Sequence, residues 1–279
     1  MSVIRFIKMH GLGNDFVVID NRENSVIFDK AFTAAIADRQ YGVGCDQVLL
    51  LKPTKTPGSD VYMEIRNVDG TEAEACGNGT RCVAALMMEE TGQDEVVIET
   101  LAGELLADRD DNGRVRVDMG VALYDWSDIP LAKEVDTLHI DFEGAPVNDG
   151  VGVNIGNPHV VFFLQDADKA ALESIGPYIE YHPLLPKRAN VEVVSLLDTN
   201  RIRMRVWERS CGITRACGSG ACASAVAACR RGITGHFVEV VSDGGSLFVE
   251  WRESDGHALL AGATAMVFRG ELDLSAIPI

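Results

Sequence analysis

Two cysteines stand in short glycine-rich turns, and each is followed by a run of small, helix-compatible residues. Cys217 opens the run 217–228, and Cys76 opens a matching run, 76–88. Each pattern predicts a helix whose first turn carries a thiol, where free N–H groups and the helix dipole favour an anion. A cysteine in that position tends towards the thiolate, although one such cysteine alone could also be inert core. Two of them indicate acid–base chemistry.

The two motifs are equivalent parts of an internal repeat. Asn14 recurs as Asn157, 143 positions further on, and Cys76 recurs as Cys217, 141 positions further on. Other pairs follow in the same order: Gln47 with Asn190, Met63 with Met204, and Asn67 with Glu208. Several matches in the same order, at spacings of 143 and 141 positions, indicate a duplication. We therefore expect two similar halves whose thiols face each other across a pseudo-two-fold cleft.

Two opposed thiols can invert a stereocentre. One group, as the thiolate, removes a proton from one face of a carbon, and the other, as the thiol, returns a proton to the opposite face. A carboxylate on that carbon can take up the developing charge if first-turn N–H groups hold it. Those groups belong to Gly77, Asn78, Gly218 and Ser219. Nothing in the sequence indicates pyridoxal phosphate, so we expect a cofactor-free racemase or epimerase of an amino acid.

The elements that position these motifs are many short strands and a few helices. In the first half, strands are predicted at 3–9, 16–20, 48–51, 61–66, 95–100, 103–109 and 114–119, with helices at 30–39 and 77–90. In the second half, strands are predicted at 160–164, 191–197, 201–207, 237–242, 245–251, 257–260 and 265–268, with a helix at 168–175 and a polar connector at 121–143. We predict two pseudo-symmetric α+β domains, each of mainly antiparallel strands around a central helix.

Composition limits the partners. A formal charge of -17 leaves no basic footprint for nucleic acid or for an anionic membrane surface. No apolar run reaches the ~18 residues of a spanning helix, and the segment 1–9 is too short and charged for a signal peptide. We expect a cytoplasmic protein with reduced thiols. The cysteines form no Cys-x-x-Cys pair, so neither disulfides nor a metal site is predicted.

Together these motifs resemble the diaminopimelate epimerase family. The shared segments cover nearly the full length: 8–16, 44–47, 67–82, 156–159, Asn190, Glu208-Arg209 and 214–220. The resemblance implies the diaminopimelate epimerase-like fold and, with domains placed at 1–120 and 121–266, a segment 267–279 that returns to the first domain. It also implies a homodimer with the region of Phe268 near the interface.

The resemblance further implies interconversion of LL- and meso-diaminopimelate, on the route to lysine and, in bacteria, to peptidoglycan. Cys76 and Cys217 would be the two bases, and His159 and Glu208 would tune the thiols. The substrate would be held by Asn14, Gln47, Asn67, Gly77, Asn78, Asn157, Asn190, Glu208, Arg209, Gly218 and Ser219. The chemistry agrees, because the unreacting end needs a carboxylate clamp and ammonium acceptors, which arginine and asparagine supply.

Other functions stay open from the residues alone. An isomerase of the same fold that acts on proline, hydroxyproline or a small acid would not need Arg209 as a second clamp. A redox or metal-binding module would use the cysteines as ligands, but the spacings Cys76-x5-Cys82 and Cys217-x4-Cys222 suit it poorly.

A few positions depart from the family or stand beside its motifs. Ser210 replaces the glycine that usually follows the Glu-Arg pair, and a positive φ there would strain it. Ser219 replaces the more usual threonine, a mild change because the N–H group does the work. Cys211 would offer an extra oxidation partner close to the site. The remaining helix cysteines, Cys82, Cys222 and Cys229, are expected in the core.

Overall fold

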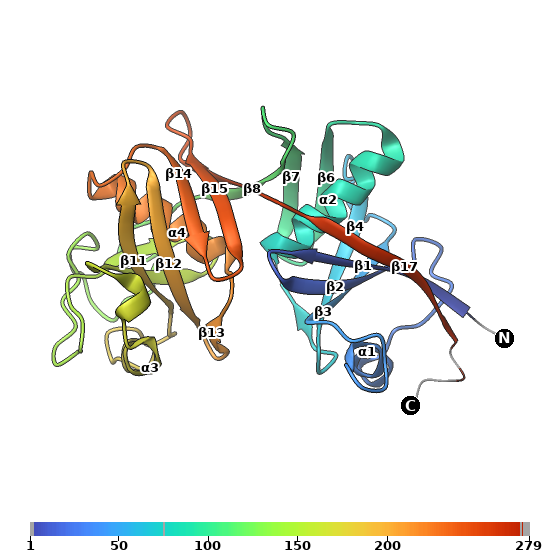
Figure 1. The fold of residues 1–279 in the computed structure, drawn as a ribbon, viewed down its shortest axis with the longest axis horizontal. Coiled ribbons are helices and arrows are strands. Elements are labelled where there is room, and N and C mark those ends of the chain that lie inside the picture. Colours follow the sequence, from blue (N-terminus) through green and yellow to red (C-terminus); the bar gives the residue numbers. More distant parts are fainter. Residues whose placement is uncertain (1–2, 75, 274, 276–279) are drawn as a thin grey trace. The chain divides into compact units, whose positions relative to one another are not determined.

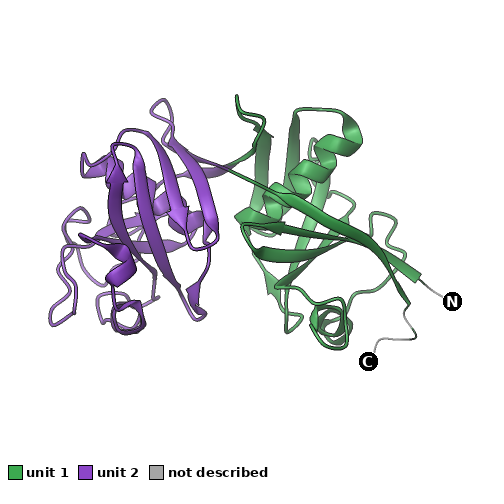
Figure 2. Cartoon of the chain, in the orientation of Figure 1, with its two compact units in different colours: residues 1–117, 262–279 green, residues 118–261 purple. Residues whose placement is uncertain are grey.

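The computed structural model describes residues 3–74, 76–273 and 275, so Ala75 of the first cysteine motif and part of the predicted returning segment lie outside the described residues. The chain divides into two compact units (Figure 2). Unit 1 consists of Met1–Val117 and Gly262–Ile279, and unit 2 consists of Asp118–Ala261. The predicted domains, 1–120 and 121–266, have boundaries a few residues away from these.

Unit 1 is a mixed sheet with two helices (Figure 1). Its strands are β1 (Val3–Gly11), β2 (Asn14–Asp20), β3 (Gln47–Lys52), β4 (Val61–Asn67), β5 (Glu72–Ala73), β6 (Glu95–Thr100), β7 (Gly103–Arg109), β8 (Val115–Val121) and β17 (Ala265–Asp273). Its helices are α1 (Lys30–Ala37) and α2 (Gly77–Thr91). Most strand pairs are antiparallel, whereas β2–β3 and β4–β6 are parallel. Helix α2 packs against β1, β2, β6 and β7.

Unit 2 repeats this arrangement. Its strands are β9 (Val151–Asn154), β10 (Pro158–Phe163), β11 (Asn190–Asp198), β12 (Arg201–Glu208), β13 (Gly212–Thr214), β14 (Phe237–Ser242), β15 (Gly245–Trp251) and β16 (His257–Gly262). Its helices are the 3₁₀ turn η1 (Ala167–Lys169), α3 (Leu172–Glu180) and α4 (Gly218–Arg230). Here β10–β11 and β12–β14 are the parallel pairs, in the places that β2–β3 and β4–β6 hold in unit 1.

The duplication extends to the strand register. In unit 1, Phe16 of β2 lies opposite Gln47 of β3. In unit 2, His159 of β10 lies opposite Asn190 of β11. Residues at equal positions in the two repeats therefore occupy equal positions in the two sheets, which confirms the repeat predicted from the sequence.

Small side chains make α4 a central helix. Every residue from Gly220 to Ala228 is buried, and the helix packs against strands β9 to β12, β14 and β15. A helix that is buried all round needs apolar or small residues on all its faces, and the alanine-rich sequence meets that need. Helix α2 ends at Thr91, and Gly92, with its left-handed backbone (φ 70°), forms the C-cap.

Three local predictions were wrong. The helix predicted at 168–175 is two elements, η1 and α3, and α3 continues to Glu180. The segment 151–154, for which no strand was predicted, is strand β9 and pairs antiparallel with β10. The connector at 121–143 is irregular but not solvated throughout, because it places Ile129, Leu131 and Phe142 in the core of unit 2.

The last long strand, β17, pairs antiparallel with β1, from Val3 opposite Asp273 to His10 opposite Ala265. It is longer than the predicted strand at 265–268 and belongs to unit 1 with its partner.

Among the helices of the described residues, none combines the length and apolar character needed to cross a membrane.

Candidate active site

Cys76 is the N-cap of α2. Its backbone is extended (φ −153°, ψ 100°), and its sulfur accepts a hydrogen bond from the N–H of Gly79 at 3.4 Å. Glycine suits this third helical position, because a Cβ on Gly79 would lie only 3.2 Å from the side chain of Leu49. The N–H groups of Gly77 and Asn78 have no acceptor within the helix. They remain available to an anion next to the thiol.

A chain of amide contacts surrounds Cys76. Oδ1 of Asn14 accepts a hydrogen bond from Nδ2 of Asn78 at 3.2 Å and lies 3.8 Å from the sulfur. Nδ2 of Asn14 donates to Asp46 at 3.0 Å. The buried guanidinium of Arg81 donates from Nη2 to Oδ1 of Asn78 at 2.6 Å. A carboxylate at one end and a guanidinium at the other therefore fix the orientation of both amides.

Gln47 and Asn67 form a second polar pair in unit 1. They lie opposite each other in β3 and β4, and Nε2 of Gln47 donates to Oδ1 of Asn67 at 3.1 Å. Nδ2 of Asn67 donates to Oγ1 of Thr71 at 3.2 Å. Both amides are half-buried, so each can still reach a ligand.

Cys217 is the N-cap of α4 and repeats the geometry of Cys76. Its backbone is extended (φ −131°, ψ 119°), and its sulfur accepts from the N–H of Gly220 at 3.4 Å. Oγ of Ser219 lies 3.5 Å from the same sulfur. The first-turn N–H groups of Gly218 and Ser219 are the counterparts of those in α2.

The surroundings of Cys217 favour the protonated thiol. Cys217 is only 7% exposed. Burial first, and then the negative charges of Glu208 and Glu192, hold the pKa of its thiol well above the usual range, against hydrogen bonds from Ser219 and Gly220 that act to lower it. Without a substrate, this thiol holds its proton at neutral pH.

His159 lies fully buried in β10 between two oxygen atoms. Its Nδ1 is 2.7 Å from Oε1 of Glu192, and its Nε2 is 2.9 Å from Oδ1 of Asn157. Glu192 in β11 is also fully buried, and its Oε2 has no hydrogen-bond partner among the described residues. Burial raises the pKa of Glu192, and the charge of His159 opposes that rise.

The remaining predicted residues of unit 2 gather around Asn190 and the end of β12. Oδ1 of Asn190 accepts from the backbone N–H of Arg209 at 2.8 Å, and its Nδ2 donates to the carbonyl of Pro158 at 3.2 Å. Glu208 accepts a hydrogen bond from Oγ1 of Thr214. Arg209 is exposed, and one guanidinium nitrogen donates to the carbonyl of Lys187 at 3.3 Å.

Ser210, which replaces the usual glycine, has a positive φ of 65°, and a serine is strained in that conformation. Two contacts hold the strained turn. The N–H of Ser210 donates to the buried carboxylate of Glu180 at 3.0 Å, and its Oγ accepts from Arg188 at 3.4 Å. Cys211 follows it and is exposed.

The predicted site residues thus form one set in each unit. Unit 1 contains Asn14, Gln47, Asn67, Cys76, Gly77 and Asn78, and unit 2 contains Asn157, His159, Asn190, Glu208, Arg209, Cys217, Gly218 and Ser219. The sequence analysis missed Arg81 and Glu192. Glu192 had a visible signal, because it is an acidic residue inside the apolar strand 191–194 at the position that Leu49 holds in the first repeat.

The other cysteines differ in burial. Cys82 and Cys222 are buried, as predicted, but Cys229 is only half-buried. Burial raises the pKa of Cys45 to about 11 and that of Cys82 to about 12. Within the described residues, no three histidine, cysteine, aspartate or glutamate side chains come together in a metal-binding arrangement.

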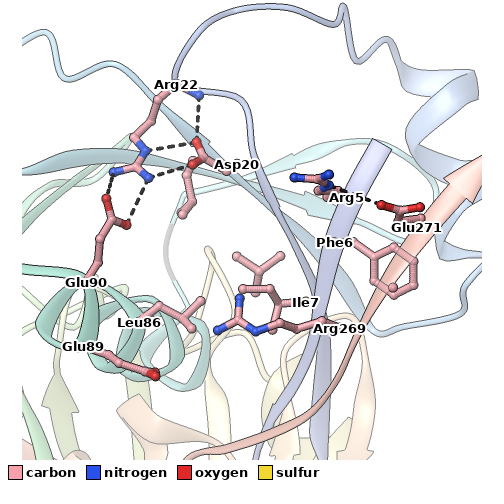
Figure 3. A pocket seen from close by; sticks show the side chains of 13 residues that line it. Arg5, Phe6, Ile7, Asp20, Arg22, Leu86, Glu89, Glu90, Arg269 and Glu271 are labelled. Carbon is pink, nitrogen blue, oxygen red and sulfur yellow. Dashed lines mark hydrogen bonds and ion pairs between the residues drawn. The ribbon is translucent and has the colours of Figure 1, made fainter. Parts of the chain in front are cut away.

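A pocket of about 660 Å³ lies elsewhere in unit 1 (Figure 3). It is bounded by β1, β2, α2 and β17, with Arg22 donating to Glu90 at 2.9 Å on one side and Arg269 on the other. Its lining contains no cysteine and none of the predicted site residues. The residues around Cys76 and Cys217 therefore do not line this pocket.

Solved structures of other proteins share this fold of two similar units. One is a hydroxyproline epimerase from Agrobacterium vitis, with a TM-score of 0.67 and 17% identity, covering 98% of this chain and 93% of that chain. Another is a phenazine biosynthesis protein of the PhzF family from Enterococcus faecalis, with a TM-score of 0.69 and 14% identity, covering 98% and 100%. The fold class is thus that of a two-unit α+β protein known from epimerases and PhzF-family proteins.

Sequence comparison defines the family within that class. The family described as "Diaminopimelate epimerase" matches twice, over residues 6–124 and 151–267. A diaminopimelate epimerase of Rhodospirillum centenum is 51% identical over 276 residues, which are 99% of this chain and 94% of the relative. One of Acidiphilium cryptum is 48% identical over 268 residues, with 96% of each chain covered. The chain belongs to the diaminopimelate epimerase family.

The burial of the thiols predicts their order of reaction with iodoacetamide. At pH 8 in the folded protein, exposed Cys211 should be alkylated at least about a hundredfold faster than Cys45 or Cys82, because these two thiols are buried from the reagent and burial raises their pKa to about 11 and about 12. Partial burial and the charges of Glu208 and Glu180 raise the pKa of Cys211 as well, but this residue is exposed to the reagent. Peptide mass spectrometry at timed intervals measures each rate. All seven cysteines should react at similar rates in guanidinium, and alkylation of Cys82 at the rate of Cys211 in the folded protein would contradict the structure.

Proposed function

We propose that this chain interconverts LL- and meso-diaminopimelate by cofactor-independent two-base epimerisation. Membership of the family supports the reaction. The observation that carries the mechanism is the repeated geometry: a cysteine is the N-cap of the central helix in each unit, and each sulfur accepts from the third helical residue at 3.4 Å.

The proton transfers balance across the two thiols. One sulfur, as the thiolate, takes the α-proton of the substrate, and the electron pair of the broken C–H bond moves towards the carboxylate. First-turn N–H groups of α2 and α4 stabilise that charge. The other sulfur, as the thiol, gives its proton to the opposite face. The thiol and the thiolate have then exchanged places, and the product has the inverted configuration.

The protonation of Cys217 fits one half of this cycle. Because its pKa is held well above the usual range, Cys217 enters as the proton donor. For the reverse direction it must become the base. The charges of Glu208 and of Glu192, to which His159 is bonded, raise the pKa of Cys217 and so hold its proton. We therefore propose His159 and Glu208 as the residues that tune this thiol.

Substrate contacts are proposed on the side chains already fixed by the two networks. Asn14, Gln47 and Asn67 offer amide groups in unit 1. In unit 2 the proposed contacts are Asn157, Asn190, Glu208 and Arg209. The exposed guanidinium of Arg209 suits the carboxylate at the unreacting end, and a carboxylate such as Glu208 suits an ammonium group. A substrate with one amino-acid end would leave these groups unused.

The product of this reaction would serve lysine synthesis and, in bacteria, peptidoglycan precursors. We also propose a cytoplasmic location. A protein whose thiols act in acid–base chemistry needs a compartment that keeps them reduced.

Substitution of either site cysteine tests the mechanism. In deuterated water with LL-diaminopimelate, no added cofactor and a reducing agent, the wild-type protein should incorporate α-deuterium and form the meso isomer. Cys76→Ser and Cys217→Ser should each lower kcat by at least about a hundredfold, because a serine hydroxyl is a far weaker acid than a thiol. Chiral chromatography and mass spectrometry measure both events.

Cys211→Ser is the matched control, because Cys211 is exposed and lies outside the proposed machinery. It should keep wild-type kcat. Wild-type protein that incorporates no α-deuterium would reject the epimerase, and full epimerisation by Cys217→Ser would reject the two-base mechanism.

We further propose a homodimer formed through β17 and its surroundings. Three consecutive apolar residues of β17 are exposed, Met266 at 42%, Val267 at 55% and Phe268 at 49%. The ring of Phe268 packs edge-on against Phe6 of β1, with centroids 5.9 Å apart. A run of exposed apolar residues on a strand is a typical site of association between chains.

Phe268→Asp should therefore produce monomers, because a carboxylate in an apolar interface loses its solvation. Light scattering after gel filtration should give the mass of two chains for the wild type and of one chain for the variant. Phe237→Asp is the control, since Phe237 is also exposed, at 51%, but lies in unit 2 and stacks on Phe248. A monomeric wild type would contradict the proposal.

A further inference from the structure

The two repeats differ at one pair of positions beneath the cysteine helices. In unit 1, Phe16 of β2 and Leu49 of β3 are fully buried apolar side chains. The same strand positions in unit 2 hold His159 and Glu192, which are also fully buried. One half of the protein thus has an apolar pair where the other has two ionisable groups. Burial of such groups is costly, so the difference calls for a function.

Glu192 lies close to the start of α4. A Cβ placed on Gly220 would be 2.7 Å from Oε1 of Glu192 and 3.4 Å from the sulfur of Cys217. The carboxylate oxygen and the sulfur surround the same point, so they can be no more than about 6 Å apart. In unit 1 the corresponding position on Gly79 meets Leu49 at 3.2 Å and the sulfur of Cys76 at 3.5 Å.

The contacts of His159 join Glu192 to a proposed substrate-binding residue. Its Nδ1 lies 2.7 Å from Oε1 of Glu192, and its Nε2 lies 2.9 Å from Oδ1 of Asn157. An ionised Glu192 accepts a hydrogen bond from Nδ1–H. The carboxylate thereby fixes the orientation of the imidazole, and the imidazole in turn contacts the amide of Asn157.

We propose that Glu192 is a positioning residue of the epimerase: its hydrogen bond to Nδ1 of His159 fixes the imidazole and the amide of Asn157 beside it, and it places a carboxylate within about 6 Å of the sulfur of Cys217. The inference rests on the proposed role of Cys217. It explains why a duplicated scaffold has unlike surroundings for its two thiols. One thiol must hold a proton while the other has none, and Glu192 and Glu208 are the charged groups that act on Cys217 to this end.

Glu192→Gln tests the proposal with little change in shape. The amide removes the charge near Cys217, so alkylation of Cys217 by iodoacetamide at pH 8 should become at least about threefold faster while that of Cys76 stays the same. His159 also loses the carboxylate that fixes its ring. We expect kcat/KM to fall about tenfold in both directions and its pH profile to shift towards lower pH, because the negative charge that raises the pKa of Cys217 is gone.

Two further variants keep the test decisive. Glu64→Gln is the control for the loss of a buried carboxylate, since Glu64 pairs with Lys52 and Arg66 in unit 1, and it should leave both alkylation rates and the pH profile unchanged. The double variant His159→Phe with Glu192→Leu copies the pair that unit 1 already packs. If Glu192→Gln does not fold, this variant should show the faster alkylation of Cys217.

The outcomes separate this inference from the proposed function. A Glu192→Gln protein with wild-type alkylation of Cys217 and a wild-type pH profile would overturn the role of Glu192, provided that Cys217→Ser is inactive. An active Cys217→Ser protein would instead reject the two-base mechanism itself.

Discussion

The first N–H groups of a helix have no hydrogen-bond acceptor within the helix itself. In both units of this chain a cysteine sulfur takes one of them, at 3.4 Å. This contact fixes the position of the sulfur and leaves the neighbouring N–H groups free for an anion. The glycines at the third helical positions have a separate cause, because a Cβ there would lie 3.2 Å from the side chain of Leu49 in unit 1 and 2.7 Å from that of Glu192 in unit 2. In unit 1 the contacts of Asn14 with Cys76 and Asn78 are built around such a helix start.

The parts of the fold that depend on local pattern could be predicted from the sequence. The small residues of α4 required a fully buried helix, and the regular spacing of Asn14, Gln47 and Cys76 with their partners revealed the duplication. Strand β9 could not be predicted, because a short segment with a glycine becomes a strand only through its pairing with β10. Residues 129–142 contribute to the core through tertiary packing, and no periodic pattern in the sequence indicates this.

The residues of the candidate site could likewise be predicted only in part. The cysteines, amides and arginine stood out by type and spacing. The contact between His159 and Glu192 did not, because these residues are 33 positions apart and meet only where two parallel strands lie side by side. The sequence shows that Glu192 lies in an apolar strand, but it does not show that His159 is its partner. The duplicated scaffold supplies equal geometry to both thiols, and substitutions at matched positions, Phe16 against His159 and Leu49 against Glu192, supply unequal electrostatics.

The central claim is that both thiols act on one carbon from opposite sides. A crystal structure with an unreactive diaminopimelate analogue tests it directly, through the distance from each sulfur to the α-carbon. The account predicts that the sulfurs of Cys76 and Cys217 both lie within about 3.5 Å of that carbon, on opposite faces. An α-carbon in contact with only one sulfur, or with both on the same face, would contradict it.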